Sequence, residues 1–397
     1  MKGPSPRHLK RFVRGPLKLG RYLRHPGDGR VRAQIRAETL LWAMIIGEVI
    51  RQGAFHAIEC LVHSRARRAL AVARRFGDDA LAYFTERLDP AVTRQALAES
   101  VRRAKRNKAF ETARWIGLAL DGTGAARSRK ARCPLCHPIY DSEHQVLGYN
   151  HHFSAISIVG TGTVLPFDVE PYGPGDSEVA ASERLLERGV VHLGPRFADY
   201  VVADGLYAGA PFVHSAGRLG LRVVIRLKAN LPELLQAAQA RFVDRPPSLT
   251  FEHDRDRVEV WDADDFDPWA ALSWSTVRVL RYRQHKPDGQ VVEAYWLTDF
   301  PSGQVGSRAL YMMAKSRWQI ENQVFNDRKN RYGLEKIRHH HANSLLIGWL
   351  LNCLALTVER LYRLRYLHRG GRAPYTAIEL VRLLCLSLGA PGPANTS

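Results

Sequence analysis

The chain has 397 residues, 45% of them hydrophobic, which is enough to bury one large core or a few smaller ones and excludes a disordered protein. Its formal net charge of +19 indicates a polyanionic partner, most often nucleic acid; an ordinary soluble protein with surplus positive charge is the alternative. Five scattered cysteines form no recognisable disulfide framework and favour a reducing compartment.

No membrane association is expected from the apolar segments. The basic N-terminus is not followed directly by an apolar run, as a signal peptide would be. The longest apolar runs, 39–50 and 345–358, are too short or too interrupted to span a bilayer. We therefore expect a cytoplasmic protein.

Positive charge is concentrated in residues 1–110, which hold 24 lysines and arginines against nine acidic residues. Residues 1–36 carry eleven of these basic residues, with Pro and Gly between them, and are predicted to form an extended basic arm. Residues 37–110 are predicted to form a helical DNA-binding region, because short helices rich in arginine are typical of such domains. A helical bundle that does not touch DNA is the alternative. The last predicted helix, 90–108, ends in the candidate DNA-binding residues Arg102, Arg103, Lys105 and Arg106.

Residues 111–230 change to strand patterns and are predicted to form the first part of a catalytic α/β core. Three strands come first, and two strands alternating with helices follow, which favours a mixed sheet in a layered fold. The predicted strands are 115–121, 152–160, 163–172, 200–204 and 221–227; the helices are 176–188 and 206–217, and 133–149 is a polar loop.

The C-terminal part divides into three predicted segments. Residues 231–305 form a β-rich insertion with strands at 248–260, 276–283 and 291–298. Residues 306–368 hold two long helices, at 310–330 and 342–367. Residues 369–397 form a C-terminal segment whose tail is rich in Pro and Gly and is expected to be frayed.

The helix at 310–330 carries an unusual charge pattern. Plotted at about 100° per residue, Arg317, Glu321 and Arg328 form a stripe down the middle of its apolar face. The apolar flanks would carry these charges inward, and an inward carboxylate needs a partner or a metal ion. A solvated charged face is the alternative.

Two further acids, Asp121 and Asp204, each close an apolar strand and precede a glycine. An acid at that point lies at the rim of the sheet, where layered α/β folds bind ligands; a turn that caps the next helix is the alternative for each acid alone. Three converging carboxylates, with Glu321, are usually held by two divalent metals roughly 4 Å apart. Oxygen ligands suit Mg²⁺ or Mn²⁺, and beside basic segments such a site implies cleavage or transfer of DNA strands.

The segments Asp121-Gly-Thr-Gly, Asp204-Gly-Leu-Tyr-Ala and Arg317-x3-Glu321 resemble the three acidic motifs of DDE transposases of bacterial insertion sequences, over residues of roughly 80–365. The resemblance implies an RNase H-like core, a five-stranded mixed sheet with flanking helices. The long interval between Asp204 and Glu321 is similar to the subgroup with a β-rich insertion there.

In that subgroup the helix with the Glu carries the signature Tyr-x2-Arg-x3-Glu-x6-Lys. This sequence keeps Arg317 and Glu321 but has Ala314 at the Tyr position and Arg328 at the Lys position. Tyr311 lies one turn earlier, and Lys329 follows Arg328.

The resemblance implies cut-and-paste transposition. Asp121, Asp204 and Glu321 would be the catalytic residues and would bind two Mg²⁺ or Mn²⁺ ions, and Arg317, Arg328 and Lys329 would contact DNA. The partners would be double-stranded DNA, at the element ends and the target, and a second copy of the chain, as a homodimer on DNA in the bacterial nucleoid.

Members of the subgroup often pass through a hairpin end, with an aromatic side chain from the insertion stabilising a flipped base. The insertion holds four tryptophans of suitable type, for which packing in its own core is the alternative: Trp261, Trp269, Trp274 and Trp296. Two alternatives to the transposase function remain open. One is an RNase H-like nuclease or resolvase without strand transfer; the other is an inactive or domesticated transposase that acts as a sequence-specific DNA-binding protein.

The segment Cys133-Pro-Leu-Cys136-His137 is compatible with a structural zinc site completed by His144, His151 or His152. One Cys-x2-Cys is half a site, so two reduced thiols in a loop near Asp121 are the favoured interpretation. The 339–341 histidine run is expected to be exposed to solvent or to contact a phosphate. Asp176 and Glu178 are expected to place negative charge at a helix N-terminus. Lys228 is expected to contact DNA or to be a solvated residue at the end of a strand.

Overall fold

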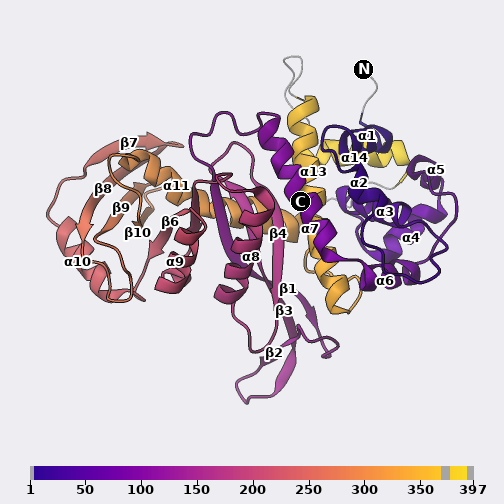
Figure 1. Cartoon of the computed structure of the whole chain (residues 1–397), viewed down its shortest axis with the longest axis horizontal. Coiled ribbons are helices and arrows are strands. Elements are labelled where there is room, and N and C mark those ends of the chain that lie inside the picture. The colour runs from indigo at the N-terminus through magenta and orange to yellow at the C-terminus, as the bar shows by residue number, and fades with distance from the viewer. Residues whose placement is uncertain (1–3, 368–375, 391–397) are drawn as a thin grey trace.

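The structure is a computed structural model that describes residues 4–367 and 376–390. Figure 1 shows a helical region at one end and a sheet that runs through the rest of the molecule. The N-terminal helices are α1 (Pro6–Arg14), α2 (Gly20–Arg24), α3 (Ala37–Val49), α4 (Phe55–His63), α5 (Ala66–Leu70), α6 (Asp78–Arg87) and α7 (Pro90–Arg106).

The prediction of an extended N-terminal arm is wrong. The side chain of Ser5 accepts a hydrogen bond from the backbone N–H of His8 and caps α1, and Leu9, Phe12 and Val13 are buried. The ring of Phe12 lies edge-on to that of Tyr362, with centroids 5.3 Å apart. Basic residues therefore cover the outer face of a helix whose apolar face belongs to the core.

The central sheet has the order expected of an RNase H-like core. Strands β4, β3 and β1 pair antiparallel, and β1, β5 and β6 pair parallel, so the order is β4-β3-β1-β5-β6. The fold prediction is confirmed. The elements are β1 (Gly117–Ser128), β2 (His137–Tyr140), β3 (Val146–Val159), β4 (Leu165–Tyr172), α8 (Glu178–Leu193), β5 (Tyr200–Ala203), η1 (Gly205–Tyr207), α9 (Ala210–Arg218) and β6 (Arg222–Leu227).

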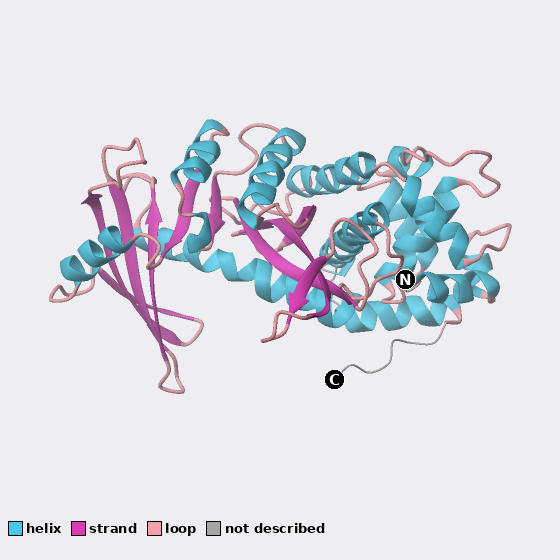
Figure 2. Ribbon diagram, turned by 90° about the horizontal axis from the view of Figure 1, so that it is seen from below, coloured by secondary structure: helices cyan, strands magenta, loops and turns pink. Residues whose placement is uncertain are grey.

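The insertion consists of α10 (Pro232–Phe242), β7 (Leu249–His253), β8 (Asp256–Phe266), β9 (Val277–His285) and β10 (Val291–Thr298). Strand β10 pairs antiparallel with β6, so the inserted strands continue the core sheet into one ten-stranded sheet (Figure 2). The prediction of a single strand at 248–260 is wrong. The segment is a hairpin that turns at Asp254 and Arg255, both with positive φ, as a two-residue hairpin turn requires.

The C-terminal elements are α11 (Ser307–Gln319), the π-helical turn η2 (Ile320–Phe325), α12 (Asn326–Tyr332), α13 (Ala342–Leu367) and α14 (Ala377–Leu388). Helix α14 was not expected from the sequence, and the predicted frayed tail beyond Ala390 lies outside the described residues. The segment Ala342–Leu364 of α13 could cross a membrane by length and composition, but 89% of its most apolar window is buried within the protein. The hydroxyl of Thr357 donates to the carbonyl of Pro166 at 2.8 Å, which holds α13 on β4.

Arg328 lies in the core and not on the surface, which contradicts the expected phosphate contact. Its side chain is fully buried. Its Nε donates to Asn352 Oδ1 at 2.7 Å and its Nη2 to the carbonyl of Trp349 at 3.0 Å, so it fastens α12 to α13. Its guanidinium also lies over the ring of Phe153 in β3.

We predict that Arg328→Ala destabilises the fold by roughly 3 kcal/mol, because it opens a cavity and leaves the buried amide of Asn352 without its donor. Urea unfolding measures the effect, and Lys329→Ala, at the less buried neighbouring residue, serves as the control with a change within about 0.5 kcal/mol. If Arg328→Ala were as stable as the wild type and lost only affinity for DNA, the buried role would be refuted.

Candidate active site

Asp121 and Asp204 are brought together by the parallel pairing of β1 with β5. Leu118 lies opposite Val201 and Ala119 opposite Val202. Two residues further along, the same register places Asp121 beside Asp204, on strands about 4.8 Å apart. The two acids therefore lie just past the last paired residues of β1 and β5, in the part of the sheet where ligands are expected. Strand β5 ends there, but β1 continues to Ser128 against β3, so the prediction that Asp121 closes its strand is wrong.

The glycine after each acid makes room for a charged side chain. A Cβ on Gly122 would lie 2.1 Å from Glu178 Oε2, and a Cβ on Gly205 would lie 2.9 Å from Lys228 Cδ. Lys228 Nζ donates to Asp204 Oδ2 at 2.6 Å. The two Asp-Gly steps are thus explained by what packs over them, a carboxylate in one case and a lysine in the other.

Glu321 reaches the site from the π-helical turn η2, a type of distortion that is frequent at functional sites. Arg317 lies between two of the acids: its Nη1 donates to Asp121 Oδ2 and its Nη2 to Glu321 Oε2, both at 3.4 Å. The Arg317 side chain is 10% exposed and that of Glu321 51%. The expectation that Glu321 points into the core is therefore wrong, and its carboxylate faces solvent at the rim of the site.

Two hydrogen bonds set the position of α11 against the sheet. The hydroxyls of Ser316 and Tyr200 lie 3.1 Å apart and join α11 to β5. The backbone N–H of Gly160, after β3, donates to Gln319 Oε1 at 3.0 Å. Since these contacts flank Arg317, they place its guanidinium over Asp121.

Glu178 is a fourth carboxylate at the site, and the sequence analysis missed this role. It is the first residue of α8, and its Oε1 accepts a hydrogen bond from the hydroxyl of Tyr207 at 2.9 Å. The hydroxyl of Tyr207 also lies 2.9 Å from that of Ser182. Tyr207 is the tyrosine of the Asp204-Gly-Leu-Tyr segment, so that motif supplies both an acid and the residue that orients Glu178.

The two aspartates have opposite electrostatic surroundings. Burial raises the pKa of Asp121 to about 7; Arg317 opposes this effect, and the charges of Glu178, Glu321 and Asp204 add to it. Burial would also raise the pKa of Asp204, but the hydrogen bonds from Lys228 and from the backbone of Gly205, together with the charges of Lys228 and Arg317, outweigh it, and the pKa lies below its usual value. The carboxylates of the site therefore carry more negative charge than its two basic side chains, Arg317 and Lys228, balance.

The donor atoms at the site fit divalent cations such as Mg²⁺ or Mn²⁺, because all are carboxylate oxygens. Asp121 lies among three other acids, and the buried Nε of Arg317 has no hydrogen-bond partner, so the guanidinium is not fully committed. Within the described part of the chain, the ligand atoms of Asp121, Asp204 and Glu321 do not all lie within 4.8 Å of one another. In this structure these carboxylates form ion pairs with protein side chains: Asp204 with Lys228, and Asp121 and Glu321 with Arg317.

The tyrosine position of the subgroup signature stays unfilled. Ala314 is buried in α11, and Tyr311 is fully buried, with its ring 5.1 Å from that of Tyr282 and 5.3 Å from that of Phe251. Neither side chain reaches the acids. Tyr311 instead joins α11 to the inserted strands.

The basic residues at the end of α7 make contacts within the protein. Arg102 Nη1 donates to the carbonyl of His192 at 2.9 Å, and Lys105 Nζ to that of Phe197 at 2.6 Å. Arg103 pairs with Glu99 at 2.7 Å, and Arg106 is exposed. A DNA contact by these residues stays a prediction. For Arg102, Arg103 and Lys105, binding to DNA would have to replace the contacts just described. A DNA contact by Lys329, which is partly buried, likewise stays a prediction.

The tryptophans of the insertion contribute to its core. Trp296 is fully buried and lies edge-on to Trp318 of α11, with centroids 5.7 Å apart. The Nε1 of Trp261 donates to the carbonyl of Arg245 at 2.7 Å. Trp269 and Trp274 are partly buried against the same core.

A sequence model of the family described as the transposase DDE domain matches residues 116–358, which is more than half of the chain and includes Asp121, Asp204 and Glu321. The chain belongs to this family of transposases, and the resemblance inferred from its motifs is confirmed. The comparison with curated proteins gives no match. Among solved structures the chain is similar to the piggyBac transposase in a synaptic complex with hairpin DNA, determined by cryo-EM. That match has 12% identity and a TM-score of 0.48, and covers 97% of this chain and 80% of that chain.

We predict that the stability of the cation-free protein falls as pH rises from about 4 to about 7. With its pKa raised to about 7, Asp121 keeps a proton in the folded state that the unfolded chain releases near pH ~4, so the folded state binds more protons in this interval. Asp121→Asn removes this dependence on pH. Relative to that variant, the wild type should lose up to about 4 kcal/mol of unfolding free energy as the pH rises through the interval. Urea unfolding over a pH series without divalent cations measures this, and parallel curves for the two proteins would contradict it.

We also predict that Glu178→Gln lowers the pKa of Asp121, because the Glu178 charge is among the causes that raise it. The upper end of the pH interval in which stability falls should move down by roughly one unit. Glu187→Gln, at an exposed position of the same helix, is the matched control and should leave the interval unchanged. An equal shift in both variants would mean that only net charge matters.

Proposed function

We propose that the protein carries out cut-and-paste transposition: metal-dependent cleavage of DNA at the ends of an insertion sequence, followed by strand transfer into target DNA. One observation carries the proposal. The register of the parallel strands β1 and β5 places Asp121 beside Asp204, just past their last paired residues, and Arg317 joins Asp121 to Glu321. A site of four acids at a sheet rim suits phosphodiester chemistry, which needs positive charge held close to the reacting phosphate.

Asp121, Asp204 and Glu321 are proposed to hold two Mg²⁺ or Mn²⁺ ions. When bound, such ions stabilise charge on the phosphate and activate water or a 3′-hydroxyl. In the first reaction the oxygen of water bonds to phosphorus and the P–O3′ bond breaks, which leaves a 3′-hydroxyl. In the second, that 3′-oxygen bonds to a phosphorus of the target and displaces the 3′-oxygen of the neighbouring nucleotide.

Arg317 and Lys228 are proposed to change partners when DNA enters. In this structure they neutralise Asp121, Glu321 and Asp204. Once divalent cations bind these carboxylates, the side chains of Arg317 and Lys228 are free to bind nearby phosphate oxygens. The bidentate guanidinium of Arg317 suits that contact, and the buried position of its stem fixes its direction.

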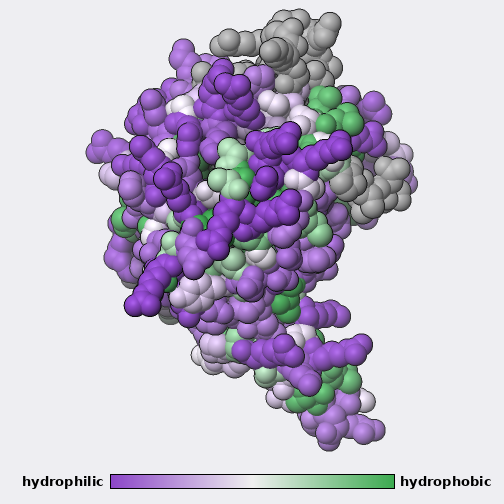
Figure 3. Space-filling model, turned by 90° about the vertical axis from the view of Figure 1, so that its right-hand side faces the viewer, coloured by the Kyte–Doolittle hydropathy of each residue, from purple (hydrophilic) through white to green (hydrophobic). Residues whose placement is uncertain are grey.

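The helical end of the molecule is proposed to bind the DNA ends. Figure 3 shows its surface, which is covered mostly by strongly hydrophilic side chains. Exposed arginines on and beside α5 contribute to it: Arg65, Arg68, Arg74 and Arg75. Joining two ends to one target would also need two copies of the chain, so we propose a homodimer on DNA.

The test is an in vitro reaction with Mg²⁺ and DNA that carries the terminal repeats flanking the gene. We expect cleavage at the repeats and joining to a second duplex, with both activities reduced at least about 10³-fold in Asp204→Asn and Glu321→Gln. Glu335→Gln, at an exposed acid beyond α12, is the control and should stay active.

Each other outcome identifies a different function. Cleavage without joining would overturn the proposal in favour of a nuclease or resolvase. Specific binding to the repeats without cleavage, in Mg²⁺ or Mn²⁺, would overturn it in favour of a DNA-binding protein derived from a transposase.

A further inference from the structure

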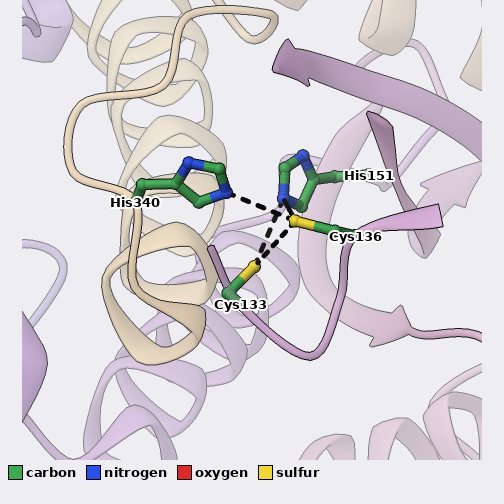
Figure 4. Close-up of side chains that lie close together, drawn as sticks. All are labelled: Cys133, Cys136, His151 and His340. Atoms are coloured by element: carbon green, nitrogen blue, oxygen red, sulfur yellow. Dashed lines mark hydrogen bonds between the residues drawn. The ribbon is translucent and has the colours of Figure 1, made fainter. Parts of the chain in front are cut away.

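Four side chains from three separate segments form a compact cluster: Cys133, Cys136, His151 and His340. Figure 4 shows the two thiols and the two imidazoles pointing toward one another. The cysteines come from the connection between β1 and β2, His151 from β3, and His340 from the connection between α12 and α13. Cys136 and His151 are buried, and the other two are partly buried.

The four ligand atoms all lie within 4.8 Å of one another, and four of the distances between them are close to those of a tetrahedral metal site. The two Sγ atoms lie 3.6 Å apart. His151 Nε2 lies 3.3 Å from Cys133 Sγ and 3.4 Å from Cys136 Sγ, and His340 Nε2 lies 3.4 Å from Cys136 Sγ. A tetrahedral zinc ion with bonds of about 2.3 Å to sulfur and about 2.0 Å to nitrogen separates two sulfurs by about 3.8 Å and a sulfur and a nitrogen by about 3.5 Å.

The surroundings orient the ligands as metal sites require. His151 Nδ1 lies 2.8 Å from the carbonyl of Ala126, so that nitrogen carries the proton and Nε2 presents its lone pair to the cluster. The backbone N–H of Cys136 donates to the carbonyl of Cys133 at 3.2 Å, and this turn aims both thiols to the same side. Both contacts come from the backbone and orient three of the four ligands: His151, Cys133 and Cys136.

We propose that this cluster binds a structural zinc ion. Two thiolates and two imidazoles fill all four positions of a tetrahedron, and a closed set with no position for water is typical of structural and not catalytic zinc. The proposal is independent of the DNA chemistry proposed for the acids, which offer oxygen ligands alone.

The zinc ion would join the catalytic sheet to the helical region. His340 lies in a short segment whose two preceding residues bind the N-terminal helices: Arg338 Nη2 pairs with Glu48 Oε1 of α3 at 2.5 Å, and His339 Nε2 lies 2.8 Å from Glu86 Oε1 of α6. On the sheet side, His151 pairs in register with Ala125, four residues along β1 from Asp121. The ion would therefore fix where the segment after the Glu321 helix meets the strand that carries Asp121.

The sequence analysis favoured reduced thiols and expected no metal ligand in the 339–341 run, and the geometry points the other way. His340 lies 204 residues from Cys136, and no spacing rule connects residues so far apart. The other histidines considered are engaged elsewhere: His152 stacks on Tyr172, and His144 lies in a turn with positive φ.

The test is the zinc content of the full chain, purified without chelators and measured by plasma mass spectrometry. We expect about one zinc ion per chain in the wild type and loss of most of it in Cys136→Ser and in His340→Ala. His341→Ala, at the exposed neighbouring histidine, is the matched control and should keep its zinc. Full zinc content in both cluster variants, or none in the wild type after reconstitution with zinc, would overturn the proposal.

A second measurement uses only the wild type and so does not depend on whether the variants fold. Co²⁺ added to the zinc-free chain should give the strong visible bands of tetrahedral cobalt together with a thiolate charge-transfer band. A weak octahedral spectrum without thiolate charge transfer would overturn the proposal. So would a Cys133–Cys136 disulfide found by mass spectrometry in protein kept under reducing conditions.

Discussion

Repulsion among carboxylates is the constraint on which the catalytic part of the structure depends. Two like charges 4 Å apart repel by about 4 kcal/mol at the effective dielectric constant near a protein surface. The protein brings Asp121, Asp204, Glu178 and Glu321 to one rim and offsets part of their charge with Arg317 and Lys228. Tertiary packing supplies the force that holds them: parallel pairing fixes the two aspartates, and the contacts of α11 fix Arg317.

Patterns that repeat along the chain were predictable from the sequence. The long apolar helix 342–367 and the strand 291–298 were predicted with the bounds that the structure has. The succession of strands and helices along the core followed from hydrophobic runs, and Asp121 and Asp204 were found because each ends such a run. These features depend on local periodicity and on the ends of elements, which neighbouring residues determine.

Features that depend on contacts between distant segments were not predictable. Arg328 was predicted to contact a DNA phosphate, but Asn352 and Trp349 of another helix bury it. Glu178 looked like a helix-capping charge, because only the fold places it over Gly122. Glu321 lies in a π-helical turn, where the spacing of a regular helix does not hold, and its carboxylate is exposed, so helical spacing alone placed it wrongly.

The central claim is that Asp121, Asp204 and Glu321 bind divalent cations together. The most direct measurement is anomalous diffraction from crystals of the full chain soaked in Mn²⁺. We expect manganese peaks within bonding distance of all three carboxylates, with Arg317 and Lys228 displaced from them, and loss of these peaks in Asp204→Asn. Saturating Mn²⁺ with no peak between the three acids, and with Lys228 still paired to Asp204, would contradict it.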